Sequence, residues 1–178
     1  MKAVFTVPLS KVIKELALRP LYEPADPETV LICSPDVNRP GLELNGYLEY
    51  FDKNRIQILG NAEYAFLRAQ TPENKAAAVD RLFAHHPPVV IIARGLEPEP
   101  EIIEAAHQYE VPLYSTQDTT SSLVAALVAY MNVELAPRIT RHGVLVEVYG
   151  EGILLVGDSG VGKSETAIEL IKRGHRLI

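Results

Sequence analysis

The chain contains a single cysteine, Cys33, among its 178 residues. One cysteine excludes a disulfide within the chain and a zinc site built from the cysteines of one chain. No apolar run approaches the ~20 residues that cross a bilayer, and the N-terminus lacks the long apolar core and cleavage site of a signal peptide. We therefore expect a cytoplasmic protein without a membrane partner.

Positive charge is also scarce, with 17 Lys and Arg against 23 Asp and Glu and a formal net charge of -6. The basic residues form no run that would follow the phosphates of a nucleic acid, so we expect no nucleic-acid partner. Hydrophobic residues make up 47% of the chain and charged residues 22%, which is the composition of a globular rather than a disordered protein.

Expected helices and strands alternate along most of the chain, which is the pattern of an α/β fold. Residues 89–93 are apolar throughout, and this favours a strand that is covered on both faces, as in a parallel sheet. We expect further strands at residues 30–33, 56–59 and 113–115, and helices at residues 10–18, from Thr71 to the Pro87-Pro88 pair, at 99–109, and from Asp118 or Thr119 through Met131.

The stretch Leu135-Ala136-Pro137-Arg138 interrupts this alternation. We place a domain boundary near it, with an N-terminal α/β domain at residues 1–132 and a second domain that starts at residue 133 and runs to residue 178. About 45 residues with two strands and one helix cannot enclose a core of their own. We therefore expect residues 133–178 to be an incomplete domain that is less stable than the first.

The second part carries expected strands at residues 144–149 and 153–156, joined by a Gly150-Glu151-Gly152 turn. A glycine-rich loop and a helix follow, and another strand begins near residue 174. Without further partners, the strand edges and the apolar side of the helix are expected to face water or another chain.

Residues 157–164 fit the pattern G-x-x-x-x-G-K-[ST] of a phosphate-binding P-loop, and they lie between an apolar strand and a helix. Glycines allow backbone angles that turn N–H groups toward phosphate oxygens, and the helix N-terminus attracts anions. Lys163 can reach the β- and γ-phosphates, and the Ser164 hydroxyl can bind Mg²⁺. The alternative is a glycine turn with a surface lysine. The expected ATP-binding residues are Gly157, Asp158, Ser159, Gly160, Val161, Gly162, Lys163 and Ser164.

Three histidines deserve comparison as candidate site residues. His142 stands before Gly143 at the start of a strand, where an exposed turn or strand-end packing position competes with a catalytic role. The pair His85-His86 suits a cationic helix end, because a metal role would need carboxylate or further histidine partners.

Residues 38–47 contain proline, glycine and asparagine, which are common in loops, and Pro40-Gly41 suits a turn. The simpler interpretation is a structured connection. The functional alternative is a small-anion or effector site around Arg39.

Several stretches together resemble the HPr kinase/phosphorylase family of bacterial sugar regulation. They cover nearly the whole chain, and the run from His142 to Leu177 is much more specific than the P-loop pattern alone. The matching residues are 38–47, 55–60, 94–98, 142–150, 157–167 and 173–177.

The resemblance implies a two-domain enzyme, with a small three-layer α/β N-terminal domain and a P-loop kinase domain akin to that of phosphoenolpyruvate carboxykinase. The family uses ATP and Mg²⁺ to phosphorylate a serine of the phosphocarrier protein HPr, and it removes that phosphate by phosphorolysis with release of pyrophosphate. This activity regulates carbon catabolite repression and sugar uptake. The resemblance also implies a homohexamer.

By the same resemblance, Lys163 contacts the transferring phosphates, Ser164 binds the metal, and His142 is the active-site histidine that donates to phosphate oxygens as their charge shifts. The family's paired catalytic aspartates, a later acidic metal ligand and a catalytic arginine would follow Ile178. We therefore expect the activity in the full-length parent and not in this chain alone.

Two other hypotheses compete with the kinase and phosphorylase. The chain could be a non-catalytic regulatory or assembly module with an incomplete nucleotide-binding loop. It could also be a generic P-loop ATPase, which would leave the match at residues 142–150 unexplained.

Overall fold

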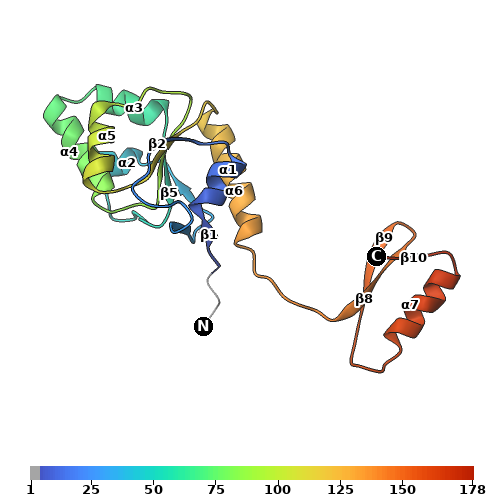
Figure 1. Ribbon diagram of the computed structural model, residues 1–178. Coiled ribbons are helices and arrows are strands. Elements are labelled where there is room, and N and C mark those ends of the chain that lie inside the picture. The colour runs from blue at the N-terminus through green and yellow to red at the C-terminus, as the bar shows by residue number, and fades with distance from the viewer. Residues whose placement is uncertain (1–4) are drawn as a thin grey trace. The chain divides into compact units, whose positions relative to one another are not determined.

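The computed structural model describes residues 5–178. The chain divides into two compact units, a first unit that ends at Ala136 and a second unit from Pro137 to Ile178 (Figure 1). Both units combine helices with β-sheets. Within the described part of the chain, no helix is long and apolar enough to span a membrane.

The first unit is built on a five-stranded sheet. Its strands are β2 (Arg19–Tyr22), β4 (Val37–Asn38), β5 (Ile56–Leu59), β6 (Val90–Ile92) and β7 (Leu113–Ser115). They lie in the order β2-β7-β6-β5-β4. The last four run parallel to one another, and only the edge strand β2 is antiparallel to its neighbour. A separate antiparallel pair joins β1 (Val7–Pro8) to β3 (Leu31–Ile32).

Helices cover both faces of this sheet, as Figure 1 shows. One face is covered by α2 (Gly41–Leu44), α3 (Asn61–Arg68), α4 (Pro72–Phe83) and α5 (Pro100–Gln108). The other face is covered by α1 (Leu9–Glu15) and α6 (Thr120–Glu134). These three layers confirm the predicted α/β fold class.

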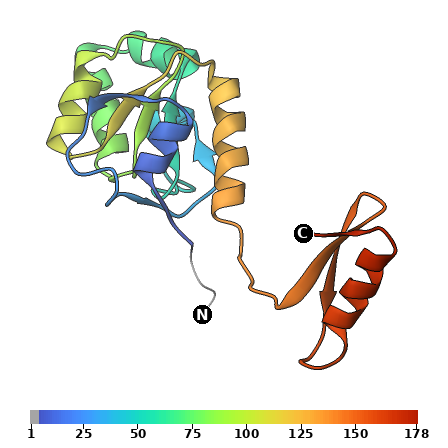
Figure 2. The same ribbon diagram turned by 45° about the vertical axis from the view of Figure 1, so that its right-hand side comes forward.

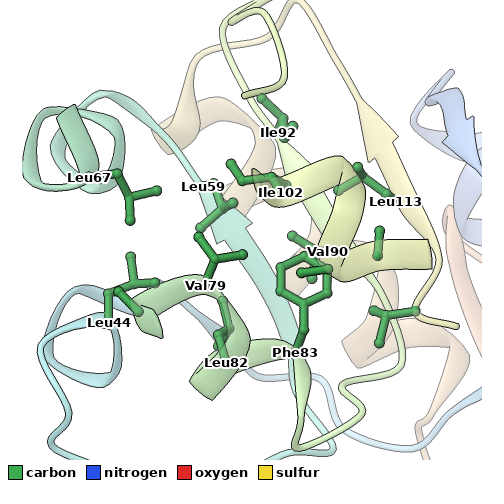
Figure 3. Close-up of a cluster of buried hydrophobic side chains, with 14 of the residues drawn as sticks. Leu44, Leu59, Leu67, Val79, Leu82, Phe83, Val90, Ile92, Ile102 and Leu113 are labelled. Carbon is green, nitrogen blue, oxygen red and sulfur yellow. The ribbon is translucent and has the colours of Figure 1, made fainter. Parts of the chain in front are cut away.

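The two faces of the sheet bury separate clusters of apolar side chains, because successive side chains of a strand point to opposite faces. In β6, Val90 and Ile92 belong to one cluster and Ile91 to the other, and all three are fully buried. Figure 3 shows the first cluster, where Leu59 of β5 joins Val90 and Ile92 against side chains of the covering helices. Burying such a side chain stabilises the fold by about 1.5–3 kcal/mol relative to leaving it exposed. The prediction of a strand buried on both faces in a parallel sheet is confirmed.

Sequence analysis missed five short elements of the first unit, namely β1, β2, β4, α2 and α3. β2 contains Pro20, which a sheet tolerates in an edge strand where a missing N–H needs no partner. The inner face of α3 buries the carboxylate of Glu63 together with Tyr64 and Leu67. A helix is usually predicted from apolar residues that recur along one face, and in α3 a charged residue, Glu63, occupies one of these buried positions.

The second unit contains a three-stranded antiparallel sheet and one helix. Its elements are β8 (Gly143–Val148), β9 (Glu151–Val156), α7 (Lys163–Lys172) and β10 (Arg176–Leu177). β8 lies between β9 and β10, and α7 packs against the sheet (Figure 2). The strand expected near residue 174 is therefore present as β10.

The connection between β8 and β9 is a two-residue turn of Tyr149 and Gly150, with φ angles of 53° and 86°. Two positive φ angles give a turn whose twist matches that of the flanking strands. The expected Gly150-Glu151-Gly152 turn is wrong in its bounds, because Glu151 already pairs with Val148 as the first residue of β9.

Three elements on one face of the first unit meet at Glu99, which directly precedes α5. Its carboxylate accepts hydrogen bonds from Arg68 Nε of α3 and Lys75 Nζ of α4, each at 2.7 Å. Partial burial acts to raise the pKa of Glu99, but the hydrogen bonds from Lys75 and Arg68 outweigh it and hold that pKa below its usual value near 4.5. The hydrogen bond to Glu99 likewise raises the pKa of Lys75.

We predict that Glu99→Gln lowers the free energy of unfolding at pH 7 by about 1–2 kcal/mol, because two charge-assisted hydrogen bonds are lost. A carboxyl whose pKa is lowered on folding stabilises the fold above its unfolded pKa, and this stabilisation is lost as pH falls through the folded pKa. The difference between wild type and variant should therefore be full near pH 7 and shrink toward pH 3. Urea unfolding at several pH values measures it.

Glu104→Gln is the matched control, since Glu104 lies on the exposed side of the same helix α5. The control should unfold like the wild type at every pH. A Glu99→Gln difference that stays constant from pH 7 to pH 3 would contradict the role assigned to the carboxylate.

Candidate functional site

The glycine-rich loop leaves β9 after Val156 and enters α7 at Lys163. Gly160 and Gly162 have φ angles of 84° and 88°, in the left-handed region that other residues adopt only with strain. Gly162 is also the residue from which α7 starts. The two glycines therefore let the chain turn from the strand directly into the helix.

The first N–H groups of α7 have no partner within the helix. Gly162 supplies no side-chain cap, and the first backbone hydrogen bond of the helix runs from Thr166 N to Gly162 O, at 2.9 Å. Ser164 lies in this first turn and is exposed. Free N–H groups at a helix N-terminus form a site for an anion.

Lys163 folds back over the loop that precedes it. Its ammonium group donates hydrogen bonds to the carbonyl oxygens of Gly157 and Asp158, at 2.8 and 2.6 Å. These contacts hold the only cation of the loop over the residues that precede the helix N-terminus. The arrangement combines a fixed positive charge with free N–H donors, which suits a phosphate group.

His142 comes to this loop through the register of the hairpin. Gly143 of β8 pairs with Val156 of β9, so the next position on each strand is His142 opposite Gly157. His142 is exposed. The pairing of β8 with β9 therefore brings His142 next to the start of the glycine-rich loop.

Gly143 allows this close pairing. A Cβ at Gly143 would stand 2.6 Å from the carbonyl oxygen of Leu155 and 2.9 Å from Cδ1 of Leu154. The backbone of β9 cannot yield without breaking the pairing, so a larger residue would push the histidine end of β8 away from the loop.

A hollow of about 390 Å³ lies beside the loop. Its lining residues are Leu154, Leu155, Val156, Val161, Lys163 and Thr166. The hollow is thus apolar along β9 and positively charged at Lys163, which is the usual make-up of a site for a ligand with an apolar body and an anionic end.

Comparison with known proteins places this arrangement in a family. Residues 7–131 match the family model described as HPr Serine kinase N terminus, and residues 133–178 match the model described as HPr Serine kinase C-terminal domain. The chain belongs to the HPr kinase/phosphorylase family. The resemblance seen in the sequence is thereby confirmed.

Two curated relatives that carry the name HPr kinase/phosphorylase illustrate the similarity. The protein from Caldicellulosiruptor bescii is 49% identical over 175 residues, which are 98% of this chain and 56% of the relative. The protein from Lachnoclostridium phytofermentans is 44% identical over 175 residues, 98% of this chain and 57% of the relative. The chain therefore spans little more than half the length of these HPr kinase/phosphorylase relatives.

Solved structures of similar fold include one from the regulatory region of a pyrophosphatase. It is the crystal structure of the CBS and DRTGG domains of the regulatory region of Clostridium perfringens pyrophosphatase, complexed with its activator diadenosine tetraphosphate. The TM-score is 0.50 at 17% sequence identity, over 67% of this chain and 45% of that chain. At this identity the likeness concerns the fold alone.

The other histidines singled out in the sequence belong to the first unit. The His85 ring packs against Phe51, with ring centroids 5.1 Å apart, and His86 Nδ1 lies 3.1 Å from the carbonyl oxygen of Tyr109. Within residues 5–178, no group of three or more His, Cys, Asp and Glu side chains could hold a metal ion. His85 thus makes a ring contact and His86 a hydrogen-bond contact with the backbone, both just after the end of α4.

The structure also shows why the second unit should be labile. Of residues 137–178, only Val146 and Ala167 are buried, while Ile168 of α7 is 53% exposed and Leu154 of β9 is 45% exposed. The apolar faces of the helix and of the hairpin thus remain open to solvent in this chain, as sequence analysis expected.

We predict that amide hydrogens of residues 143–178 exchange at least about 100-fold faster than those of β6, because local opening of the second unit exposes little additional apolar surface. Hydrogen exchange read by mass spectrometry on the 178-residue chain measures this, with β6 as the reference in the same sample. Equal protection of both units at low protein concentration, where association between chains is excluded, would contradict it.

Proposed function

We propose that this chain supplies the N-terminal domain and the nucleotide-binding start of an enzyme that phosphorylates a serine of HPr with ATP and also removes that phosphate by phosphorolysis. Residues 1–132 form the first domain, and residues 133–178 open the kinase domain. The observation that carries the proposal is the hairpin register, which sets His142 opposite the first residue of the glycine-rich loop. A generic P-loop needs no such histidine.

The residues of the loop fit a nucleotide triphosphate with Mg²⁺. Free N–H groups at the start of α7, the Lys163 ammonium and the neighbouring hollow supply donors, charge and space. Gly157 to Ser164 would hold the phosphates, and the Ser164 hydroxyl would bind the metal ion. Mg²⁺, when bound, neutralises negative charge on the phosphate oxygens.

Lys163 and His142 have different parts in this proposal. Lys163 holds the transferring phosphate group in place, both before and during transfer. His142, on the opposite strand, donates a hydrogen bond to a phosphate oxygen as negative charge develops there. The serine that accepts the phosphate comes from HPr, the proposed protein partner. The family resemblance also supports assembly with further copies of the same chain, as a homohexamer.

We predict that Lys163→Ala, made in a protein of the full length of the relatives, lowers HPr phosphorylation by at least about 100-fold and weakens ATP binding as well. The glycine-rich loop would lose its own cation, which is proposed to face the phosphates. Phosphorylation of HPr and nucleotide titration on the same preparation measure both effects. Lys172→Ala, at the other end of α7, is the matched control and should retain both activities. Normal HPr phosphorylation by the Lys163→Ala protein would contradict the assignment of this loop as the ATP site.

We predict that His142→Ala in the same protein lowers turnover by about 10²–10³-fold while ATP affinity changes by less than about threefold. A group that acts on developing charge lowers the rate and leaves ground-state binding nearly intact. The matched control is Arg141→Ala, an exposed neighbour that should keep wild-type turnover. Should the His142→Ala protein turn over normally, His142 is merely a residue at the end of a strand.

A further inference from the structure

The alternation of side chains along β8 places His142 on the face of the sheet that α7 covers. Successive side chains of a strand point to opposite faces, so His142 shares its face with Val144 and Val146. Val146 is fully buried, and α7, whose Ala167 is also buried, packs against β8. Because α7 begins where the glycine-rich loop ends, His142 lies on the side of the sheet to which this loop leads.

Two glycines border His142 in the hairpin. Gly143 follows it in β8 and pairs with Val156, and Gly157 is the residue opposite it at the start of the loop. Gly157 has no side chain, so the imidazole has no cross-strand side chain beside it at this position. The distance between the His142 backbone and the loop therefore depends on how closely β8 approaches β9 at Gly143.

This approach leaves no room for a side chain at Gly143. Ordinary van der Waals contact of a Cβ atom begins at 3.4 Å, whereas a Cβ at Gly143 would stand only 2.6 Å from the carbonyl oxygen of Leu155. That oxygen belongs to the backbone of β9 and cannot turn away as the end of a flexible side chain can. Any residue other than glycine would thus separate the two strands at the end that carries His142.

A second glycine of the same hairpin shows that the tight approach is local. Gly152 of β9 pairs with Glu147, and a Cβ at Gly152 would have no atom within 4 Å. Neither Gly143 nor Gly152 has a positive φ angle, so the backbone conformation does not require glycine at either position. Glycine is needed at Gly143 for the space between the strands.

The close approach lies on the face of the sheet opposite to α7. By the alternation along β8, Gly143 shares its face with Leu145, which is 37% exposed. A methyl group at Gly143 would therefore leave the contact between Val146 and α7 intact, together with Lys163 and the N–H groups at the start of that helix.

We propose that Gly143 is a positioning residue for the phosphate transfer, since its missing side chain lets β8 approach β9 closely enough to hold His142 at the glycine-rich loop. The inference rests on the proposed function and deepens it. Gly143 has no group to offer the phosphates and acts through the imidazole of its neighbour. A donor that acts on developing charge depends on a distance that the protein fixes before the reaction.

The test compares Gly143→Ala with Gly152→Ala in a protein of the full length of the relatives. Gly143→Ala should lower turnover in HPr phosphorylation at least about tenfold and change ATP affinity by less than about threefold, because a misplaced catalytic group impairs transfer more than ground-state binding. Gly152→Ala is the matched control, since it adds the same methyl group to the same hairpin in open space, and it should turn over like the wild type. Phosphorylation of HPr and nucleotide titration on the same preparations measure both quantities.

The double variant His142→Ala/Gly143→Ala shows whether Gly143 acts through the histidine. Without the imidazole there is nothing for Gly143 to position, so the double variant should turn over within about twofold of His142→Ala. A double variant that is clearly slower than His142→Ala would overturn the proposal, as would normal turnover of Gly143→Ala. Loss of ATP binding together with turnover in Gly143→Ala would overturn it too, because the hairpin as a whole would then need the glycine.

These outcomes are distinct from a failure of the proposed function. Impaired turnover of His142→Ala beside normal turnover of Gly143→Ala keeps the catalytic histidine and rejects the role of Gly143. Normal turnover of His142→Ala removes the histidine from the reaction and this inference with it.

Discussion

Burial of the parallel strands on both faces governs the architecture of the first unit. Because β5 and β6 have no solvent-facing side, each needs helices on two sides, and parallel strands need a crossover between them. Even Gln57 of β5 is buried, and its side chain is satisfied by Asn38 Nδ2 at 2.9 Å and by the carbonyl oxygen of Arg55 at 2.8 Å. The same constraint brings the ends of all four strands to one edge, where Arg39 meets α6.

The second unit is organised differently, since it has almost no core. Three local features hold its glycine-rich loop in shape, namely the left-handed glycines, the hydrogen bonds of Lys163 and the pairing of β8 with β9. These features fix the backbone conformation of the loop but add little to the free energy of unfolding of the second unit. The glycine-rich loop can therefore have a defined form in a segment of which most apolar side chains are exposed.

Sequence patterns predicted the parts of the fold that rest on local rules. The apolar run of β6, the Thr71 and Thr119 caps of α4 and α6, and the P-loop motif all act over a few residues. The elements that were missed rest on distant partners instead. α3 depends on Glu63, whose partner Arg39 is remote in sequence, and a buried carboxylate breaks the apolar pattern.

The candidate site residues also differ in whether a local sequence pattern is enough to predict them. Residues 157–164 could be proposed as a phosphate site from the motif alone, because phosphate binding needs those residue types in that order. His142 was favoured as a site residue only through the family resemblance, since its position opposite Gly157 depends on the exact register of the hairpin, and the expected turn was wrong in its bounds.

The two-residue turn at Tyr149 and Gly150 closes the β8–β9 hairpin and fixes which residues of the two strands pair. A strand alternates its faces at every residue, so one inserted or deleted residue there would turn His142 to the opposite side of the hairpin. Side chains along the ladder can vary while the count between histidine and loop stays constant. The length of the hairpin thus fixes the position of His142 relative to the glycine-rich loop, and this constraint applies to the number of residues in the ladder and not to their identities.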